Sequence, residues 1–150
     1  MKKILIAVVG IILMSTVSAQ IKDPVSWSFS ATKADGNNYE LHITATIDKG
    51  WHIYSQTTPD GGPVATKIDF VKSPLVTLIG KTKETGKLEQ KHEELFGLDV
   101  KQFSNRVDFV QLIQLKAKVK TNITGTIKFM SCNDSECLPP KTQKFSIPLN

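Results

Sequence analysis

The stretch Tyr39-Glu40-Leu41-His42-Ile43-Thr44-Ala45-Thr46-Ile47-Asp48 decides the fold class of this chain. Its side chains alternate between apolar and polar with a period of two, which predicts a β-strand with one buried face. Val25, Trp27 and Phe29 alternate with serines in the same way a short distance upstream. The turn-forming residues 35–38 lie between the two runs, so we predict that they form a β-hairpin.

The rest of the chain continues this pattern of short apolar runs and turns. Further strands are expected in six segments: 51–54, 65–70, 75–79, 107–115, 123–130 and 142–149. The run 107–115 is the most apolar and is the candidate for a central strand. No long segment has helical periodicity. We therefore predict an all-β domain of eight or nine short strands, folded as an immunoglobulin-like β-sandwich.

The N-terminus predicts export. Lys2 and Lys3 precede an apolar run at 4–14, and small residues at 17–19 suit a signal peptidase, which would cleave before Gln20. We expect residues 1–19 to be a signal peptide and 20–150 to be one domain, periplasmic or secreted, with no membrane insertion after cleavage. The apolar run is too short to favour a transmembrane helix. An uncleaved membrane anchor is the alternative.

The charge pattern argues against nucleic acid as a partner. The formal net charge is +5, and the lysines are scattered along the chain. Between Lys116 and Lys120 they alternate with apolar residues, as on a half-exposed strand. There is no basic block with interleaved aromatic residues, which nucleic-acid binding would favour.

Cys132 and Cys137 are the only cysteines of the chain, and the four residues between them are polar or turn-forming. This spacing suits a hairpin loop that sets the two cysteines opposite each other, with Cα atoms about 4.5 to 5.5 Å apart. Disulfides form and persist in exported proteins. A bond that closes so small a loop contributes only about 2 kcal/mol, against about 4.7 kcal/mol for a 100-residue loop. The placement therefore indicates a disulfide that opens in use.

The run from Cys132 to Pro140, with its Cys137-Leu138-Pro139-Pro140 ending, resembles the close of the N-terminal periplasmic domain of DsbD-type thiol:disulfide interchange proteins. Residues 50–55 (GWHIYS) resemble the glycine-aromatic-x-x-Tyr segment of that family. Residues 92–97 (HEELFG) resemble its cap loop, in which acidic residues precede an apolar side chain. The resemblance extends from about Val25 to Leu149.

The resemblance implies an immunoglobulin-like sandwich whose cysteine pair alternates between dithiol and disulfide. It implies a protein thiol:disulfide oxidoreductase that needs no cofactor. Electrons would come from the thioredoxin-like domain of a membrane-spanning reductase and pass to periplasmic disulfide-exchange proteins. The chain ends after this domain, so we expect a standalone copy without the membrane-spanning part.

The resemblance also assigns roles to individual residues. Cys137 corresponds to the cysteine that forms mixed disulfides with partners, and Cys132 would then be the resolving or buried partner. Leu95 and Phe96 correspond to the cap that shields the pair until a partner displaces it. The cap and flanking positions together are Glu93, Glu94, Leu95, Phe96, Tyr54 and Pro139. The spacing between the cysteines is one residue shorter than in the best-known member of the family.

The chemistry of exchange leads to a similar expectation. Exchange requires a thiolate, access to a sulfur atom and a second thiol that resolves the mixed disulfide. An apolar cap would raise the pKa of the thiols by desolvation, and nearby Asp134 and Glu136 would act in the same direction. A slow nucleophile of this kind suits a relay that reacts with chosen partners.

Other interpretations remain open for the same residues. The cysteine pair suits a permanent disulfide in a non-catalytic immunoglobulin-like interaction domain. With Met130 it also suits a soft ion such as Cu(I). Pro139 and Pro140 can simply end strand pairing, and Trp51 and Tyr54 can be core aromatics. The three histidines do not have metal-ligand spacing, so we expect no metal site and solvated or hydrogen-bonded roles for His42, His52 and His92.

Overall fold

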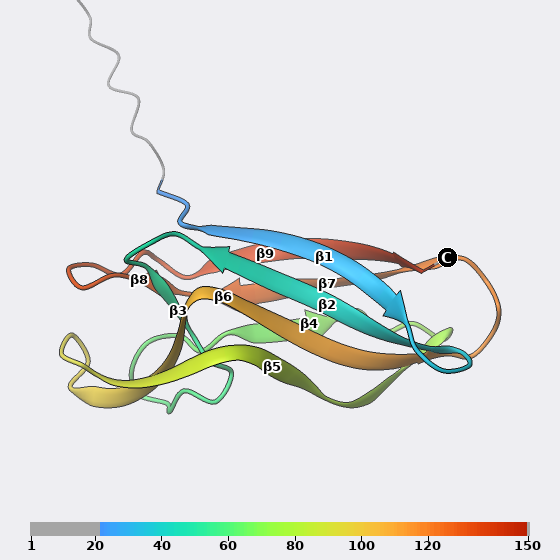
Figure 1. The fold of residues 1–150 in the computed structure, drawn as a ribbon, viewed down its shortest axis with the longest axis horizontal. Coiled ribbons are helices and arrows are strands. Elements are labelled where there is room, and N and C mark those ends of the chain that lie inside the picture. The colour runs from blue at the N-terminus through green and yellow to red at the C-terminus, as the bar shows by residue number, and fades with distance from the viewer. Residues whose placement is uncertain (1–21, 150) are drawn as a thin grey trace, which may run out of the picture.

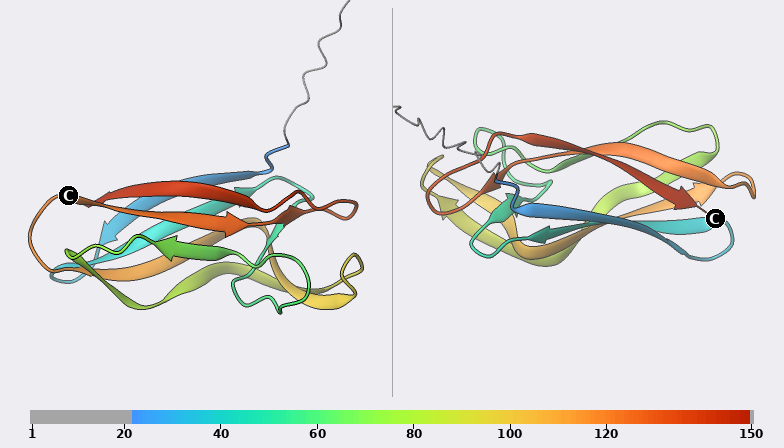
Figure 2. Two further views of the ribbon diagram at one scale, coloured as in Figure 1. Left: turned by 180° about the vertical axis from the view of Figure 1, so that it is seen from behind. Right: turned by 90° about the horizontal axis from the view of Figure 1, so that it is seen from above.

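The computed structural model describes residues 22–149 and shows two antiparallel β-sheets packed face to face (Figures 1 and 2). The predicted signal peptide lies outside the described residues. The strands are β1 (Val25–Lys33), β2 (Asn38–Ile47), β3 (His52–Tyr54), β4 (Lys67–Phe70), β5 (Val76–Glu93), β6 (Leu98–Leu115), β7 (Thr121–Phe129), β8 (Ser131–Cys132) and β9 (Lys141–Leu149). The predicted all-β sandwich is confirmed. Within this part of the chain, no helix has the length and apolar character to cross a membrane.

The larger sheet is built around β6. Its strands run in the order β1-β2-β6-β3-β8, and β5 pairs with the other side of β6. The first half of β6 therefore lies between β3 and β5, and the second half lies between β2 and β5. The smaller sheet has the order β4-β7-β9. The expectation that 107–115 forms a central strand is confirmed.

The predicted hairpin of the first two strands is also confirmed. Val25 pairs with Ile47 at its open end and Lys33 with Tyr39 at its closed end. Gly36 in the connecting turn has a φ of 63°, a left-handed conformation that costs glycine little. The alternation read from the sequence thus corresponds to one face packed on the core and one face in contact with solvent.

The expectation of uniformly short strands was wrong for β5 and β6, which have 18 residues each. The predicted strand at 75–79 is only the start of β5, which continues to Glu93. The continuation is rich in lysine and mostly exposed, because β5 is an edge strand that pairs only with β6. Backbone pairing holds it in the sheet, so it needs no apolar face and shows no apolar alternation.

Alternating side chains from both sheets meet in one main core. Its fully buried members include Leu41, Ile43, Val107, Phe109, Ile113, Ile127 and Ile147. Aromatic contacts join the layers: the ring centroid of Trp27 on β1 lies 5.2 Å from that of Phe129 on β7. Phe29 and Phe145 stack across β1 and β9 with their centroids 5.7 Å apart.

The chain changes sheets just before the first cysteine. β7 pairs with β9 as far as Phe129 opposite Lys141. After Met130 the chain joins the larger sheet, where β8 pairs with β3. The hairpin that carries the two cysteines therefore projects at one end of the sandwich, close to the start of β3 (Figure 1).

Candidate functional site

Cys132 and Cys137 form a disulfide at the base of the predicted hairpin loop, with their Cα atoms 4.1 Å apart. The backbone N–H of Asn133 donates to the carbonyl of Glu136 at 2.9 Å, and that of Leu138 donates to Ser131 at 2.9 Å. The side-chain oxygen of Asn133 accepts hydrogen bonds from the backbone N–H groups of Ser135 at 2.9 Å and Glu136 at 2.8 Å. The opposed geometry expected from the spacing is confirmed, at a Cα separation slightly shorter than expected.

The two cysteines differ in exposure. Cys132 is fully buried, whereas Cys137 is half-buried at the edge of the loop. Cys132 forms a small core of its own with Tyr54 and Val100, and Leu98, Met130 and Cys137 pack against it. An incoming thiol therefore finds Cys137 more accessible than Cys132.

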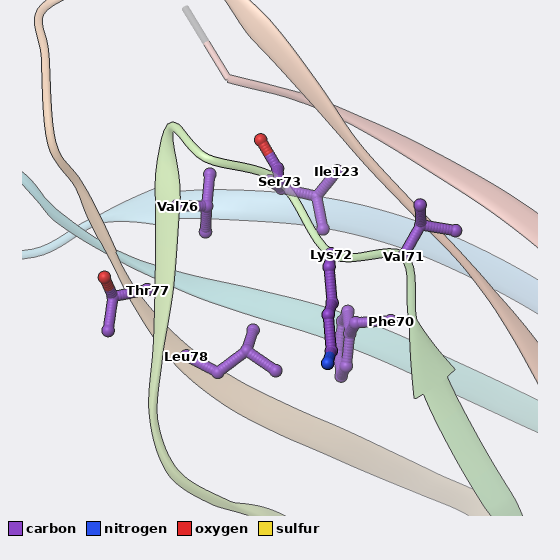
Figure 3. A pocket seen from close by; sticks show the side chains of 8 residues that line it. All are labelled: Phe70, Val71, Lys72, Ser73, Val76, Thr77, Leu78 and Ile123. Atoms are coloured by element: carbon purple, nitrogen blue, oxygen red, sulfur yellow. The ribbon is translucent and has the colours of Figure 1, made fainter.

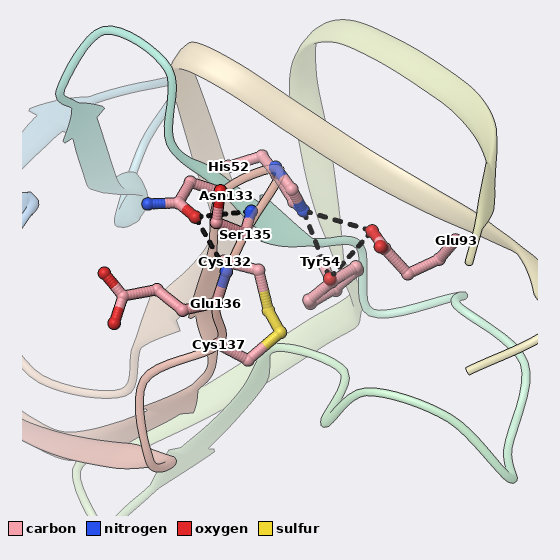
Figure 4. Close-up of a disulfide and its surroundings, with 8 residues drawn as sticks. All are labelled: His52, Tyr54, Glu93, Cys132, Asn133, Ser135, Glu136 and Cys137. Atoms are coloured by element: carbon pink, nitrogen blue, oxygen red, sulfur yellow. Dashed lines mark hydrogen bonds and ion pairs between the residues drawn. A yellow bond between two sulfur atoms is a disulfide. The ribbon is translucent and has the colours of Figure 1, made fainter. Parts of the chain in front are cut away.

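A hydrogen-bonded group of three polar side chains lies beside this disulfide (Figure 4). The Tyr54 hydroxyl donates to Glu93 Oε2 at 3.4 Å and lies 3.1 Å from His52 Nε2. The phenol has a single proton, and because that proton goes to Glu93, the histidine Nε2–H donates to the Tyr54 oxygen. His52 Nε2 is also 3.6 Å from Glu93 Oε2. All three residues are buried.

Burial changes the acid–base properties of this group. Burial lowers the pKa of His52 below its ordinary value, and the opposing negative charge of Glu93 is a smaller effect. Burial also raises the pKa of Tyr54, and the charge of Glu93 and its hydrogen bond add to this. The phenol therefore stays protonated, and burial biases the imidazole of His52 toward its neutral form.

The structure brings two of the predicted flanking residues, Tyr54 and Glu93, next to the cysteines. Glu93 also starts the turn between β5 and β6, because its carbonyl accepts from the backbone N–H groups of Phe96 at 3.1 Å and Gly97 at 2.8 Å. The group containing Tyr54 therefore holds the base of this turn close to the disulfide.

The tip of the turn is more open than its base. Glu94 is exposed, Leu95 is 55% exposed, and Phe96 is half-buried. Among the described residues, the side chains packed around Cys132 do not include Leu95 or Phe96. Pro139 is exposed and follows the second cysteine closely. The exposed tip of the turn is therefore not packed on Cys132.

The two acidic residues of the cysteine loop have lysine partners. Asp134 Oδ1 lies 3.2 Å from Lys91 Nζ of β5. Glu136 pairs with Lys22 at the start of the described chain. These partners offset the negative charge that the sequence led us to expect beside the thiols.

The sequence interpretation did not identify His52 as a site residue. It predicted a strand at 51–54, in which residues 52 and 54 share a face. The likeness of residues 50–55 to a segment of a known family was the signal in the sequence that could have pointed to His52. The opposition of His52 to Cys132 depends on the pairing of β3 with β8. That pairing joins segments far apart in the sequence and has no local signature.

Two further features lie outside this group. Within residues 22–149, no set of three or more histidine, cysteine, aspartate or glutamate side chains is arranged to hold a metal ion. An apolar hollow of about 340 Å³ lies beside the loop between β4 and β5 (Figure 3). Its lining residues are Phe70, Val71, Lys72, Ser73, Val76, Thr77, Leu78 and Ile123. The loop between β4 and β5 lies at the end of the sandwich away from β8 (Figures 1 and 2).

The sequence of residues 19–149 matches the family model described as "Thiol:disulfide interchange protein DsbD, N-terminal". The chain belongs to the DsbD N-terminal family. The resemblance inferred from the cysteine hairpin is therefore confirmed, and the chain is of the kind found as a component of thiol:disulfide interchange proteins. No curated protein matches the sequence.

Two solved N-terminal domains, one of ScsB and one of DsbD, have the same fold. The N-terminal periplasmic domain of ScsB from Proteus mirabilis has a TM-score of 0.54 at 16% identity, over 83% of this chain and 44% of that one. This chain thus spans less than half of that domain. The reduced DsbD N-terminal domain of Neisseria meningitidis has a TM-score of 0.51 at 18% identity, over 83% of this chain and 86% of that one. A complex of the DsbD and PilB N-terminal domains of the same organism has a TM-score of 0.49 at 15% identity, over 80% of each chain.

Proposed function

We propose that this chain is a thiol:disulfide interchange module of the periplasm, which relays electrons from a membrane reductase to periplasmic partner proteins through Cys132 and Cys137. The observation that carries the proposal is the unequal exposure of the disulfide in a domain of the DsbD N-terminal family. Cys137 is within reach of a partner, and Cys132 is fully buried behind it.

The unequal exposure assigns an order to the exchange. A thiolate of the electron donor attacks Cys137 Sγ, the bond between the cysteines breaks, and Cys132 leaves with the electron pair as a thiolate. The second thiolate of the donor then attacks its own mixed-disulfide sulfur and releases Cys137. Two electrons and two protons are thereby transferred to the cysteine pair, and the donor becomes a disulfide. The same steps in reverse reduce a periplasmic partner.

The residues around the disulfide are proposed to regulate access to it. Leu95 and Phe96 would act as the cap that a partner displaces, with Glu94 beside them. The tip of their turn lies at the same end of the sandwich as the cysteine loop in every view (Figures 1 and 2), and the ion pair of Lys91 with Asp134 links the two segments. Pro139 offers no backbone N–H for strand pairing, which keeps the chain next to Cys137 open.

The compartment and the partners follow from the same proposal. The ScsB relative is a periplasmic domain, and export to an oxidising space would permit this disulfide to form. The thioredoxin-like domain of a membrane reductase is the proposed donor. The proposed acceptors are other periplasmic disulfide-exchange proteins, and the exchange needs no cofactor because the sulfur atoms carry the electrons.

The reduction potential of the cysteine pair tests the proposal. Equilibration of residues 20–150 in thiol buffers is expected to give a value between roughly −180 and −270 mV, where exchange proteins lie. A value well below about −300 mV would identify a structural disulfide and favour an interaction domain. A second readout uses single-cysteine variants expressed in the native compartment. The Cys132→Ser variant should accumulate mixed disulfides through Cys137, whereas Cys137→Ser, its matched control, should not.

A further inference from the structure

His52 and Cys132 are direct neighbours across two strands. They are register partners in the antiparallel pairing of β3 with β8. Side chains of directly opposed residues leave the same face of a sheet, with Cβ atoms about 4.5 to 5.5 Å apart. Tyr54, two residues further along β3, shares this face and packs against Cys132 (Figure 4). The side chains of His52 and Cys132 therefore leave the same face of the sheet from neighbouring strands.

The departing sulfur needs a proton at this position. Cys132 is fully buried, so water cannot stabilise the thiolate that forms when the disulfide opens. The Tyr54 proton is held by Glu93, and the Glu93 carboxylate is an acceptor. Histidine is the side-chain type whose ordinary pKa lies near neutral pH, and His52 is the residue directly opposite Cys132.

We propose that His52 is the acid–base partner of Cys132, an assignment that rests on the proposed interchange function. When a donor thiolate attacks Cys137, the imidazolium of His52 gives its proton to the Cys132 sulfur and becomes neutral. In the reverse direction, neutral His52 takes the proton from the Cys132 thiol. The resulting thiolate attacks the sulfur of Cys137 in the mixed disulfide and releases the partner as a thiolate.

Tyr54 and Glu93 act as positioning residues for this step. His52 Nε2–H donates to Tyr54, which donates to Glu93, so the ring orientation is set by two hydrogen bonds. Nδ1 makes no hydrogen bond within the described part of the chain, so it is the ring nitrogen that Tyr54 leaves free to gain and lose a proton. The Glu93 carboxylate, 3.6 Å from Nε2, offsets the positive charge of the imidazolium.

The charges around His52 decide when it is protonated. Glu89, Lys91 and Glu93 face it from β5 and Asp134 from the cysteine loop, while its register partner on β6, Ser104, is uncharged. The three carboxylates raise the pKa of His52 and Lys91 lowers it, but burial is the largest effect, and the resulting pKa is below 6.5. The share of His52 in the imidazolium form, which is the acid of the proposed step, therefore grows as the pH falls.

The test is the pH dependence of disulfide reduction by dithiothreitol between about pH 5 and pH 8, which brackets histidine titration. Each rate is divided by the thiolate fraction of the reductant. The corrected rate of the wild-type protein should rise as the pH falls through the pKa of His52. In His52→Gln this rise should be absent, and the acid-limit rate should be about a hundredfold lower. An unchanged profile in His52→Gln would overturn the assignment.

Two further variants separate catalysis from folding. His92→Gln, which removes an exposed histidine bonded to Asp99, should keep the wild-type profile. Glu93→Gln should move the inflection to lower pH, because it removes a charge that raises the pKa of His52. If Glu93→Gln left the inflection in place, His52 would not be the titrating group. Far-ultraviolet circular dichroism confirms that each variant is folded.

The result can be distinguished from failure of the proposed function. Dithiothreitol reduces the disulfide whether or not a biological partner exists, so the profile reports on His52 alone. A reduction potential of the cysteine pair well below about −300 mV, together with the loss of the inflection in His52→Gln, would contradict the relay function and support proton transfer by His52. A reduction potential in the range of exchange proteins, together with an unchanged pH profile in His52→Gln, would support the relay function and overturn the role of His52.

Discussion

Gly125 has the least room for a Cβ atom of the glycines in the described part of the chain. It lies on β7 between β4 and β9, and a Cβ atom added there would be 2.4 Å from the Asp69 carbonyl oxygen and 2.4 Å from the Phe145 ring. Gly125→Ala should therefore lower the free energy of unfolding by about 1 to 3 kcal/mol, measured by urea denaturation, because backbone on one side cannot move aside. Thr124→Ala, an exposed neighbour on the same strand, should change it by less than about 0.5 kcal/mol. Equal effects of the two substitutions would contradict the crowding at Gly125.

At the scale of elements, a carboxylate from β5 binds the start of the connection between β3 and β4. Glu84 accepts from the Ser55 hydroxyl at 2.7 Å and from the Gln56 backbone N–H at 2.7 Å. Glu84→Ala leaves the Gln56 backbone N–H without this acceptor and leaves the buried Ser55 hydroxyl with Thr57 Oγ1 as its side-chain partner, at a cost of about 1 to 3 kcal/mol. Limited proteolysis should then cut the 57–63 loop faster than in wild type. Glu40→Ala removes an exposed carboxylate from β2 and should leave the cleavage rate unchanged; if both variants were cut equally, Glu84 would not anchor the loop.

At the scale of the whole molecule, the disulfide contributes little to the stability of the sandwich. It closes a small loop at one end, while the main core joins both sheets without it. Reduction should lower the free energy of unfolding by about 2 kcal/mol or less, as loop-closure entropy predicts, and the reduced domain should stay folded. Urea denaturation with and without reductant measures this difference. The double variant Cys132→Ala with Cys137→Ala should not respond to reductant, and unfolding of the wild-type domain on reduction would contradict the prediction.

The sequence by itself determined the features that depend on neighbouring residues. Alternation from 25 to 48 predicted the first hairpin, and the turn-forming residues between Cys132 and Cys137 predicted the opposed cysteines. Both results are local, because a period of two and a short turn specify a strand and its return without help from the rest of the chain.

Only the tertiary structure decided the surroundings of the disulfide. β5 is long because β6 supplies its backbone partners, so its polar sequence carries no apolar alternation. The change of sheet after Met130 sets Cys132 opposite His52, and the turn after β5 brings Glu93 to the same place. These contacts join segments tens of residues apart. They depend on register and on packing between strands, which no local pattern encodes.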